Sequence, residues 1–316
     1  MDWSKSEMQL AIEELAGTIL SEAADPWASL QESELLGLTD FLDLTTLLIE
    51  VGKSGARVPL LATEVLGAPL ARFGQAVPAG TVLTGGLLEA ESHSPRSPQT
   101  RVESGRLYGT KICVPAAEVA QRMVVPAQDG VYAVDLADCR IEQQTGTDDD
   151  ALGEVHMAGV PAERLGGPEV LDWWLPRVDV GVSAVLLGLS QTALGMTAKY
   201  LRERHQFGKP IGSFQAVQQR AADAWILTEV MEVSLWQAAW RVSEELPSQR
   251  ERAIARYWAS EGSHTICASA QHLHGGFGFD RDYPLHRFFL AAKQHEFILG
   301  GANAQLARLG ALVAAG

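Results

Sequence analysis

The sequence predicts an α+β protein that is mostly α-helical, and three observations lead to this fold class. Apolar residues at three- and four-residue spacing, typical of amphipathic helices, run through residues 1–78 and return after residue 166. Between them, short runs rich in β-branched and aromatic residues alternate with Gly, Pro, Asp and Ser, as in strands and turns. We therefore expect an N-terminal helical domain (1–78), a middle antiparallel β-domain (79–166) and a C-terminal four-helix bundle (167–316).

The N-terminal domain is predicted to begin with a helix over residues 6–22. Ser6 is a typical N-cap residue, because its side chain can accept a hydrogen bond from the first helical turn. The apolar residues that recur at helical spacing are Met8, Ile12, Leu15 and Ile19. A second helix is expected to end at Gly52 and Gly55, and a third before Gly74.

Five short runs predict the strands of the β-domain, which we expect to form an antiparallel barrel or sandwich. They are TVLTGGLL, GRLYGTKICV, RMVVPA, GVYAVDL and EVHMAGV. The segment SHSPRSPQT between the first two runs is expected to be an exposed loop. The acidic segment TGTDDD lacks the Gly and distal Glu spacing of a calcium loop, so we interpret it as a solvated turn.

Four long helices are predicted for the C-terminal part, at roughly 168–204, 213–245, 248–274 and 283–314. Helices of this length are stabilised mainly by burying an apolar stripe against one another, which predicts a bundle. The tryptophans in this part fall on helical stretches, where core packing or subunit contact is the default interpretation.

Composition excludes several classes of protein. A formal net charge of −14 and a pI near 5.0 argue against nucleic acid and membrane as partners, because both favour a basic surface. The three cysteines are far apart and form no CxxC pair, so neither a disulfide framework nor a zinc ribbon is expected. Without a basic leader or a run of about 18 apolar residues, we expect a cytoplasmic protein.

Other enzyme classes lack their signatures. The eight histidines show no HExxH motif or comparable ligand spacing, so no metal site is predicted. A GxSxG nucleophile elbow is absent from the sequence, and the GGFG segment opens no helix after a strand, as a dinucleotide fingerprint would.

Two breaks between the bundle helices have an unusual composition. The first is RERHQFGKPIGSFQAVQ (202–218), where Gly and Pro end one helix and Ser213 can cap the next. A plain helix–helix connection accounts for those residues, but not for the Arg and Gln side chains around them. The second is QHLHGGFGFDRDYPLHRFF (271–289), whose glycines permit close backbone approach to a ligand and present free amides.

Together, these motifs resemble the acyl-CoA dehydrogenase family. The bundle of that family carries RxxFGxPIxxFQxxQ, then QxxGGxGFxxxxPLxRxxRDA, then a loop with E-G-T. The resemblance spans the whole sequence, because the family also has a helical domain, a β-domain and a four-helix bundle in this order. It implies the acyl-CoA dehydrogenase fold, an acyl-CoA substrate and FAD shared across a subunit interface. The two motifs would then reach the adenine and pyrophosphate end of an FAD held mainly by a neighbouring subunit.

The resemblance assigns cofactor contacts to seven residues. Arg204 suits a pyrophosphate because a guanidinium donates two parallel hydrogen bonds, and Gly275 and Gly276 let the backbone approach the phosphates. His272 stands where the family has a glutamine. The predicted cofactor-binding set is Arg204, Gln206, Phe207, Gln215, His272, Gly275 and Gly276.

The residues that would let this chain use its own flavin are missing. Gly300 stands at the usual catalytic glutamate, and Val178 stands where some relatives carry that glutamate instead. The nearest carboxylates, Asp179 and Glu296, lie on long helices, where solvation or pairing is expected rather than catalysis. No catalytic residue is therefore predicted. General-base catalysis contributes roughly 10²- to 10⁴-fold, so its loss is a large change.

The β-domain departs from the family in the same direction. Cys113 and Pro115 occupy the places of the Trp and Thr/Ser that pack against the flavin ring. A proline has neither a side-chain hydroxyl nor an amide proton, so Pro115 cannot replace a donor to the ring.

These features predict a subunit of an FAD-dependent acyl-CoA dehydrogenase that lacks the usual glutamate and contributes to the FAD site of its partner. It resembles the degenerate subunit of the α2β2 heterotetramers of actinobacterial steroid catabolism. Its first helical region (1–78) is short for the family, which would leave the acyl pocket open for a bulky acyl group. Two alternatives stay open: a self-sufficient homotetrameric enzyme with a relocated base, and a non-catalytic acyl-CoA-binding or scaffold protein on the same fold.

Overall fold

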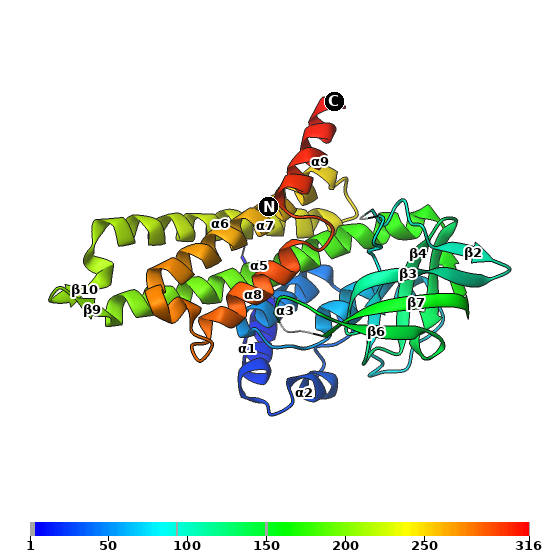
Figure 1. Cartoon of the computed structure of the whole chain (residues 1–316), viewed down its shortest axis with the longest axis horizontal. Helices are drawn as coiled ribbons and strands as arrows, with labels where there is room; N and C mark the ends of the chain where they lie inside the picture. Colours follow the sequence, from blue (N-terminus) through cyan, green and yellow to red (C-terminus); the bar gives the residue numbers. More distant parts are fainter. Residues whose placement is uncertain (1–3, 93, 149–150, 316) are drawn as a thin grey trace. The chain divides into compact units, whose positions relative to one another are not determined.

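A computed structural model describes residues 4–92, 94–148 and 151–315. It confirms the α+β, mostly helical fold class (Figure 1). Its contacts form two compact units, one built from residues 1–56 and 179–316 and the other from residues 57–178. The division into three domains at residues 78 and 166 stays a prediction.

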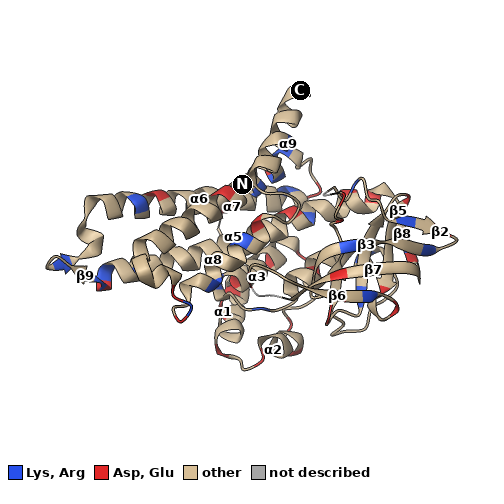
Figure 2. Cartoon of the chain, in the orientation of Figure 1, with Lys and Arg blue, Asp and Glu red and all other residues tan. Residues whose placement is uncertain are grey.

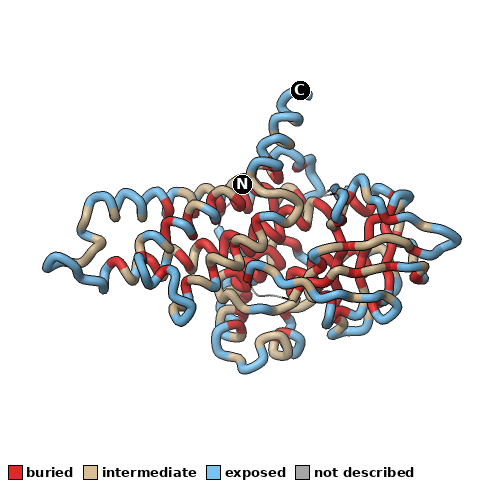
Figure 3. The backbone as a smooth tube through the Cα atoms, viewed as in Figure 1, coloured by how far each residue is buried: buried red, intermediate tan, exposed pale blue. Residues whose placement is uncertain are grey.

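The first unit is helical. Its elements are α1 (Glu7–Glu22), α2 (Pro26–Glu32), α3 (Phe41–Ser54), most of α5 (Pro168–Glu203), α6 (Gln215–Ser243), α7 (Gln249–His274), α8 (Leu285–Glu296) and α9 (Ala302–Ala314). Buried residues follow the sides along which the long helices face each other, whereas α9 and the hairpin between α5 and α6 are largely exposed (Figure 3). The unit therefore has a core between its long helices.

The predicted N-cap of α1 is confirmed, but of its predicted apolar face only Ile12 is fully buried. Ser6 accepts a hydrogen bond from the Gln9 amide at 3.1 Å, and the Gln9 side chain accepts one from the Ser6 amide at 2.9 Å, which completes a capping box. The buried side of the helix carries Gln9, Ile12, Ala16 and Leu20. Met8 is 57% exposed and Leu15 46% exposed, so the packing of α1 against α3 selects a face rotated from the one expected.

The sequence predicts a helix end at Gly52, but Gly52 lies inside α3. A close crossing of α3 and α5 explains why a glycine stands there. The helix α3 ends at Gly55, which has φ +60°, while Gly52 lies inside it. A Cβ atom on Gly52 would overlap the Val185 carbonyl, and one on Gly188 would overlap the Ile49 carbonyl. The two glycines thus bring the helix backbones together, and the Thr192 hydroxyl donates to the Lys53 carbonyl at 2.7 Å beside them.

Two alanine substitutions in α5 are expected to change stability in opposite directions. In Gly188→Ala the new methyl group meets backbone atoms of α3 that cannot rotate away, so we expect a loss of about 1–3 kcal/mol. Gly195→Ala has open space around its new methyl group and gains helix propensity, so we expect about 0.5–1 kcal/mol of stabilisation. Urea unfolding of both variants checks the pair. Equal effects would contradict the close crossing.

The long helices α5, α6 and α7 confirm three of the predicted bundle helices within a few residues at each end. The prediction of a single helix over 283–314 is wrong, because the chain forms α8 and α9 with a break at residues 297–301. Leu299 has φ +57° and Gly300 has φ +91° in this break, and neither value is compatible with a continuous right-handed helix. The break places Gly300 in a loop.

Helix α5 is also long and apolar enough to span a membrane by length and composition alone. However, 72% of its most apolar window is buried inside the protein, as in the central helix of a soluble bundle.

The second unit carries two four-stranded sheets. The strands are β1 (Leu83–Gly85), β2 (Arg101–Glu103), β3 (Arg106–Pro115), β4 (Arg122–Ala127), β5 (Gly130–Asp135), β6 (Arg140–Thr145), β7 (Ala151–Pro161) and β8 (Glu163–Gly166). One sheet has the order β1-β4-β5-β8 and the other β2-β3-β7-β6, and every neighbouring pair is antiparallel except β1 with β4. The π-helical turn η1 (Ala62–Leu66) and the helix α4 (Ala68–Phe73) precede the strands.

All five predicted strand runs are confirmed, and three strands were missed. The missed strands β2 and β8 are short, and β6 is a polar edge strand whose sequence RIEQQT lacks the expected apolar alternation. The predicted loop SHSPRSPQT is confirmed as a loop in its described residues, while residue 93 lies outside them. In TGTDDD the last two residues also lie outside the described part, and Asp148 is buried rather than solvated.

Candidate functional site

The first break between bundle helices forms a hairpin that extends beyond the ends of α5 and α6 (Figure 1). The Arg204 amide still donates to the Tyr200 carbonyl at 2.8 Å, and the Arg204 carbonyl accepts from the Ile211 amide at 2.8 Å. Phe207 and Gly208 form the turn with φ +53° and +78°, the signs that a type I′ hairpin requires. The sequence therefore ends α5 and returns the chain beside Arg204.

Phe207 at the hairpin tip is both exposed and strained. Its side chain is 90% exposed, and a positive φ at a bulky residue costs on the order of 1–3 kcal/mol. The ring meets Phe214 edge-on, with 6.1 Å between centroids, and the Lys209 ammonium lies 4.4 Å from the centre of the Phe214 ring. The Phe207 ring is therefore accessible from outside the chain.

The second break follows the end of α7 and is shaped by its glycines. Gly275 has φ +59° and ψ −133°, a combination that an L-residue avoids, and a Cβ atom on Gly275 or Gly276 would meet nothing within 4 Å. Gly278 differs, because a Cβ atom there would overlap the Gln271 carbonyl. Gly275 and Gly276 thus present open backbone, while Gly278 is required for packing.

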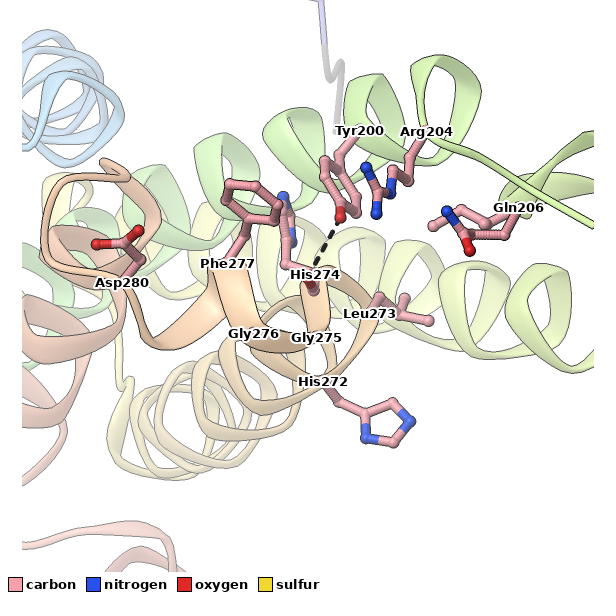
Figure 4. A pocket seen from close by; sticks show the side chains of 11 residues that line it. Tyr200, Arg204, Gln206, His272, Leu273, His274, Gly275, Gly276, Phe277 and Asp280 are labelled. Carbon is pink, nitrogen blue, oxygen red and sulfur yellow. Dashed lines mark hydrogen bonds between the residues drawn. The ribbon is translucent and has the colours of Figure 1, made fainter.

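The two breaks enclose a pocket of about 570 Å³ (Figure 4). Five of the seven predicted cofactor-binding residues line it: Arg204, Gln206, His272, Gly275 and Gly276. Figure 4 shows the His272 ring pointing away from the Arg204 guanidinium. Phe207 and Gln215 are exposed near the hairpin and do not line the pocket.

Six residues that line the pocket were not predicted from the sequence: Tyr200, Ile211, Leu273, His274, Phe277 and Asp280. Helical spacing would have found Tyr200, because it precedes Arg204 by one turn of α5 and shares its face. Buried His274 carried no such signal, since its role depends on contacts between three segments.

The hairpin end carries several basic residues, whereas the chain as a whole is acidic. Arg202, Arg204 and Lys209 lie at this end, and Figure 2 shows the concentration of basic residues there. An exposed guanidinium beside glycine backbone with open space around it is a suitable receptor for a diphosphate. The arrangement can therefore hold an anionic, aromatic ligand, with Tyr200 and Phe277 as apolar walls.

The loop at residues 297–301 carries no acid and is held by two buried side chains. The Arg256 guanidinium is 0% exposed and donates to the carbonyls of Ile298 at 2.5 Å and Gly300 at 3.4 Å. The Gln305 amide donates to the Leu299 and Gly300 carbonyls at 3.0 and 3.1 Å. Burial lowers the pKa of Arg256 to about 10, so the guanidinium is still charged at neutral pH.

Gly300 could not carry the missing carboxylate without a change in the loop. Its φ of +91° strains any L-residue, and a Cβ atom there would lie 2.7 Å from the Ala304 Cβ. Val178, the other position at which the resemblance predicts an acid, is fully buried. Both positions therefore lack an acid, and the backbone at Gly300 is specific to glycine.

The two nearest carboxylates are buried and ion-paired. Asp179 is 2% exposed, and its Oδ2 accepts from Arg252 Nη1 at 2.5 Å and Arg308 Nη1 at 3.2 Å. Glu296 is 7% exposed and lies 3.0 Å from the Lys293 ammonium. Both carboxylates are thus already engaged in ion pairs within the first unit.

In the β-domain, Cys113 and Pro115 offer no free amide donor. The Cys113 amide donates to the Gln144 side-chain oxygen at 2.9 Å, and the Gln144 amide nitrogen in turn donates to Glu154 at 3.1 Å. Pro115 has no amide proton, and its carbonyl accepts from the Thr84 hydroxyl at 2.6 Å. The Cys113 amide and the Pro115 carbonyl are thus both hydrogen-bonded within the second unit. No cluster of three or more potential metal ligands occurs among the described residues.

Comparisons with known proteins agree on one family. A model of the acyl-CoA dehydrogenase C-terminal domain matches residues 172–313. Acyl-CoA dehydrogenase FadE27 of Mycobacterium tuberculosis is 37% identical over 297 residues, which cover 85% of this chain and 80% of that protein. The ChsE4-ChsE5 complex from Mycobacterium tuberculosis matches with a TM-score of 0.91 at 32% identity, covering 99% of both chains. A variant of the Tcur3481-Tcur3483 steroid ACAD matches with a TM-score of 0.88 at 35% identity, covering 98% of both.

Proposed function

Because the chain belongs to the acyl-CoA dehydrogenase family, we propose that it is the subunit without the catalytic base in a heteromeric, FAD-dependent acyl-CoA dehydrogenase. In this proposal, the chain contributes to a flavin site completed by a second dehydrogenase subunit, and the partner supplies the catalytic base. The observation that carries the proposal is the contrast between an open pocket beside Arg204 and two base positions without an acid.

The pocket fits one end of FAD. Arg204 offers paired donors for a pyrophosphate, the turn at Gly275 and Gly276 leaves its backbone open, and Tyr200 and Phe277 offer aromatic surface. Exposed Phe207 at the hairpin tip would supply an apolar contact beside it. The flavin-ring end of FAD does not fit the corresponding residues of this chain. The Cys113 amide already donates to Gln144, and Pro115 has no amide proton. This asymmetry favours a cofactor shared between two chains.

The chemistry divides between the subunits in the same way. When bound, FAD supplies the two-electron acceptor for a reaction in which the acyl-CoA loses an α-proton and a β-hydride. This chain binds and orients the diphosphate end through Arg204 and the open glycine turn. The proton must leave to a base on the partner, because Asp179 and Glu296 are already paired inside this chain.

The names of the similar structures support two further parts of the proposal, the substrate class and a second subunit. One is a steroid ACAD and another is a complex of two differently named chains. We accordingly propose a bulky, steroid-derived acyl-CoA as the substrate and an assembly with a second dehydrogenase subunit. The α2β2 stoichiometry and the cytoplasmic location are proposed from the sequence alone.

Purification of the chain alone and with its partner tests the proposal. Alone, the chain is expected to be colourless, whereas co-expression with the dehydrogenase subunit encoded by the adjacent gene should yield about one FAD per heterodimer. The absorption spectrum and the native mass of the complex measure both values. A yellow protein that dehydrogenates an acyl-CoA without any partner would refute the proposal and establish a self-sufficient enzyme. Absence of flavin even in the complex would instead support a scaffold role.

A further inference from the structure

A cluster of aromatic side chains lies beneath the glycine turn of the pocket. His274 is the last residue of α7 and is 2% exposed. Its ring stacks on Tyr200 of α5, with 4.4 Å between centroids and 25° between planes, and lies 5.2 Å from the ring of Tyr283. Figure 4 shows His274 between Tyr200 and Phe277, directly before Gly275. The imidazole therefore joins α5, the end of α7 and the segment after the turn.

The hydrogen bonds of His274 determine its tautomer. Nδ1 lies 2.8 Å from the Ala270 carbonyl, which can only accept, so Nδ1 carries the proton. In a neutral imidazole, Nε2 is then an acceptor, and the Tyr283 hydroxyl 3.2 Å away donates to it. The Tyr283 hydroxyl remains a donor, because burial and the neighbouring Tyr200 and Glu203 raise its pKa. A protonated imidazole would have two donors, so the Tyr283 hydroxyl would have to reverse and accept, and the positive charge would lie in a buried site that disfavours it.

We propose that neutral His274 is a positioning residue, which fixes the Gly275–Gly276 turn for its ligand by holding Tyr283 and Tyr200 against the end of α7. Gly275 and Gly276 have no side chains that pack against the protein, so apart from the bond from the Gly275 amide to the His272 carbonyl the turn depends on the groups around it. What the turn binds rests on the proposed function. That His274 holds the turn, and that acid releases it, rests on the contacts above.

The direction of the pH effect follows from the environment of His274. Burial lowers the pKa of His274, opposed by the bond to the Ala270 carbonyl. The charged groups near the cluster are Glu203 and Arg204 on α5 and Asp280 after the turn, and burial outweighs them. A histidine with a folded-state pKa below its unfolded value of about 6.5 stabilises the fold above that value. This contribution is lost as the pH falls from about 6.5 toward the folded-state pKa.

Two ring-preserving variants test the proposal in the complex with the partner subunit. His274→Phe keeps the stacking and removes both polar contacts, while Tyr283→Phe removes only the hydroxyl. Each loses the Tyr283–His274 bond, so each should weaken FAD binding at pH 7.5 by about fivefold, the usual effect of one neutral hydrogen bond. His264→Gln, a substitution of an exposed histidine elsewhere on α7, is the matched control and should leave FAD binding unchanged.

The pH profile separates positioning from general stability. FAD occupancy of the unmodified complex should fall between pH 7 and pH 5, and the profile of His274→Phe should be flat relative to it. An unchanged profile in His274→Phe would overturn the proposal.

Hydrogen exchange gives a readout without flavin. In the chain alone, the amides of residues 275–279 should exchange at least threefold faster at pH 5 than their rates at pH 7.5 predict after correction for the intrinsic pH dependence of exchange. This excess should vanish in His274→Phe. If no FAD binds to the complex at all, the proposed function fails, but the exchange experiment still decides the role of His274. Equal excess exchange in both proteins would refute it.

Discussion

Replacing Arg204 with alanine is expected to weaken FAD binding by the heteromeric complex about 10- to 100-fold. Hydrogen bonds to charged groups contribute about 1.5–3 kcal/mol, and Arg204 is the basic side chain that lines the pocket beside the open glycine turn. The folded state should be unaffected, because the Arg204 side chain is exposed and its backbone bonds to Tyr200 and Ile211 persist. Equilibrium dialysis of FAD against the apo-complex measures the change.

Two companion variants make this result specific. Arg202→Ala removes an exposed arginine from the same helix end without touching the pocket, and it should retain normal FAD affinity. Arg204→Lys keeps the charge but loses the planar pair of donors, so its affinity should lie between those of the unmodified protein and Arg204→Ala. Equal FAD affinity in Arg204→Ala and Arg202→Ala would remove Arg204 from the site.

Replacing Asp179 with asparagine is expected to destabilise the first unit by about 3–5 kcal/mol. The substitution leaves the Arg252 guanidinium, which is 5% exposed, without its buried counter-charge, and it also weakens the link from α5 to Arg308 on α9. At about 2–4 °C per kcal/mol, the melting temperature should fall by about 6–20 °C. Circular dichroism at 222 nm follows the helical transition directly.

The matched control for Asp179 lies on the same helix. Asp172 forms an exposed pair with Arg96, so Asp172→Asn should change stability by less than about 1 kcal/mol. Adding Arg252→Met to Asp179→Asn removes the uncompensated cation and should recover part of the loss. If Asp179 were a relocated catalytic base, Asp179→Asn would abolish activity while leaving the melting temperature close to normal. That outcome would favour the self-sufficient enzyme.

Local signals in the sequence were sufficient for most elements. Ser6 and Gln9 complete a capping box within one turn, and Gly55 ends its helix through its own φ of +60°. The hairpin at Phe207 and Gly208 likewise depends on adjacent residues, so the motif could be recognised and Arg204 placed beside it. Signals of this kind act over a few residues and are therefore visible in the chain order.

Contacts between distant segments explain what was missed. Gly52 was interpreted as a helix end, yet it is a crossing point that only its partner Gly188 on α5 reveals. His274 belongs to the site through its contacts with Tyr200 and Tyr283, which the sequence does not reveal.

The sequence alone determined the fold class, the order of helical and β-rich segments and the two bundle motifs, and it predicted that Val178 and Gly300 stand in place of the catalytic carboxylate. Each of these depends on residue identity or on spacing along the chain. Only the tertiary structure showed which face of α1 is buried and that Asp179 is ion-paired with two arginines. It alone also placed the buried His274 imidazole next to the glycine turn. The physical reason is that burial and pairing depend on which distant side chains meet, and local spacing does not encode this.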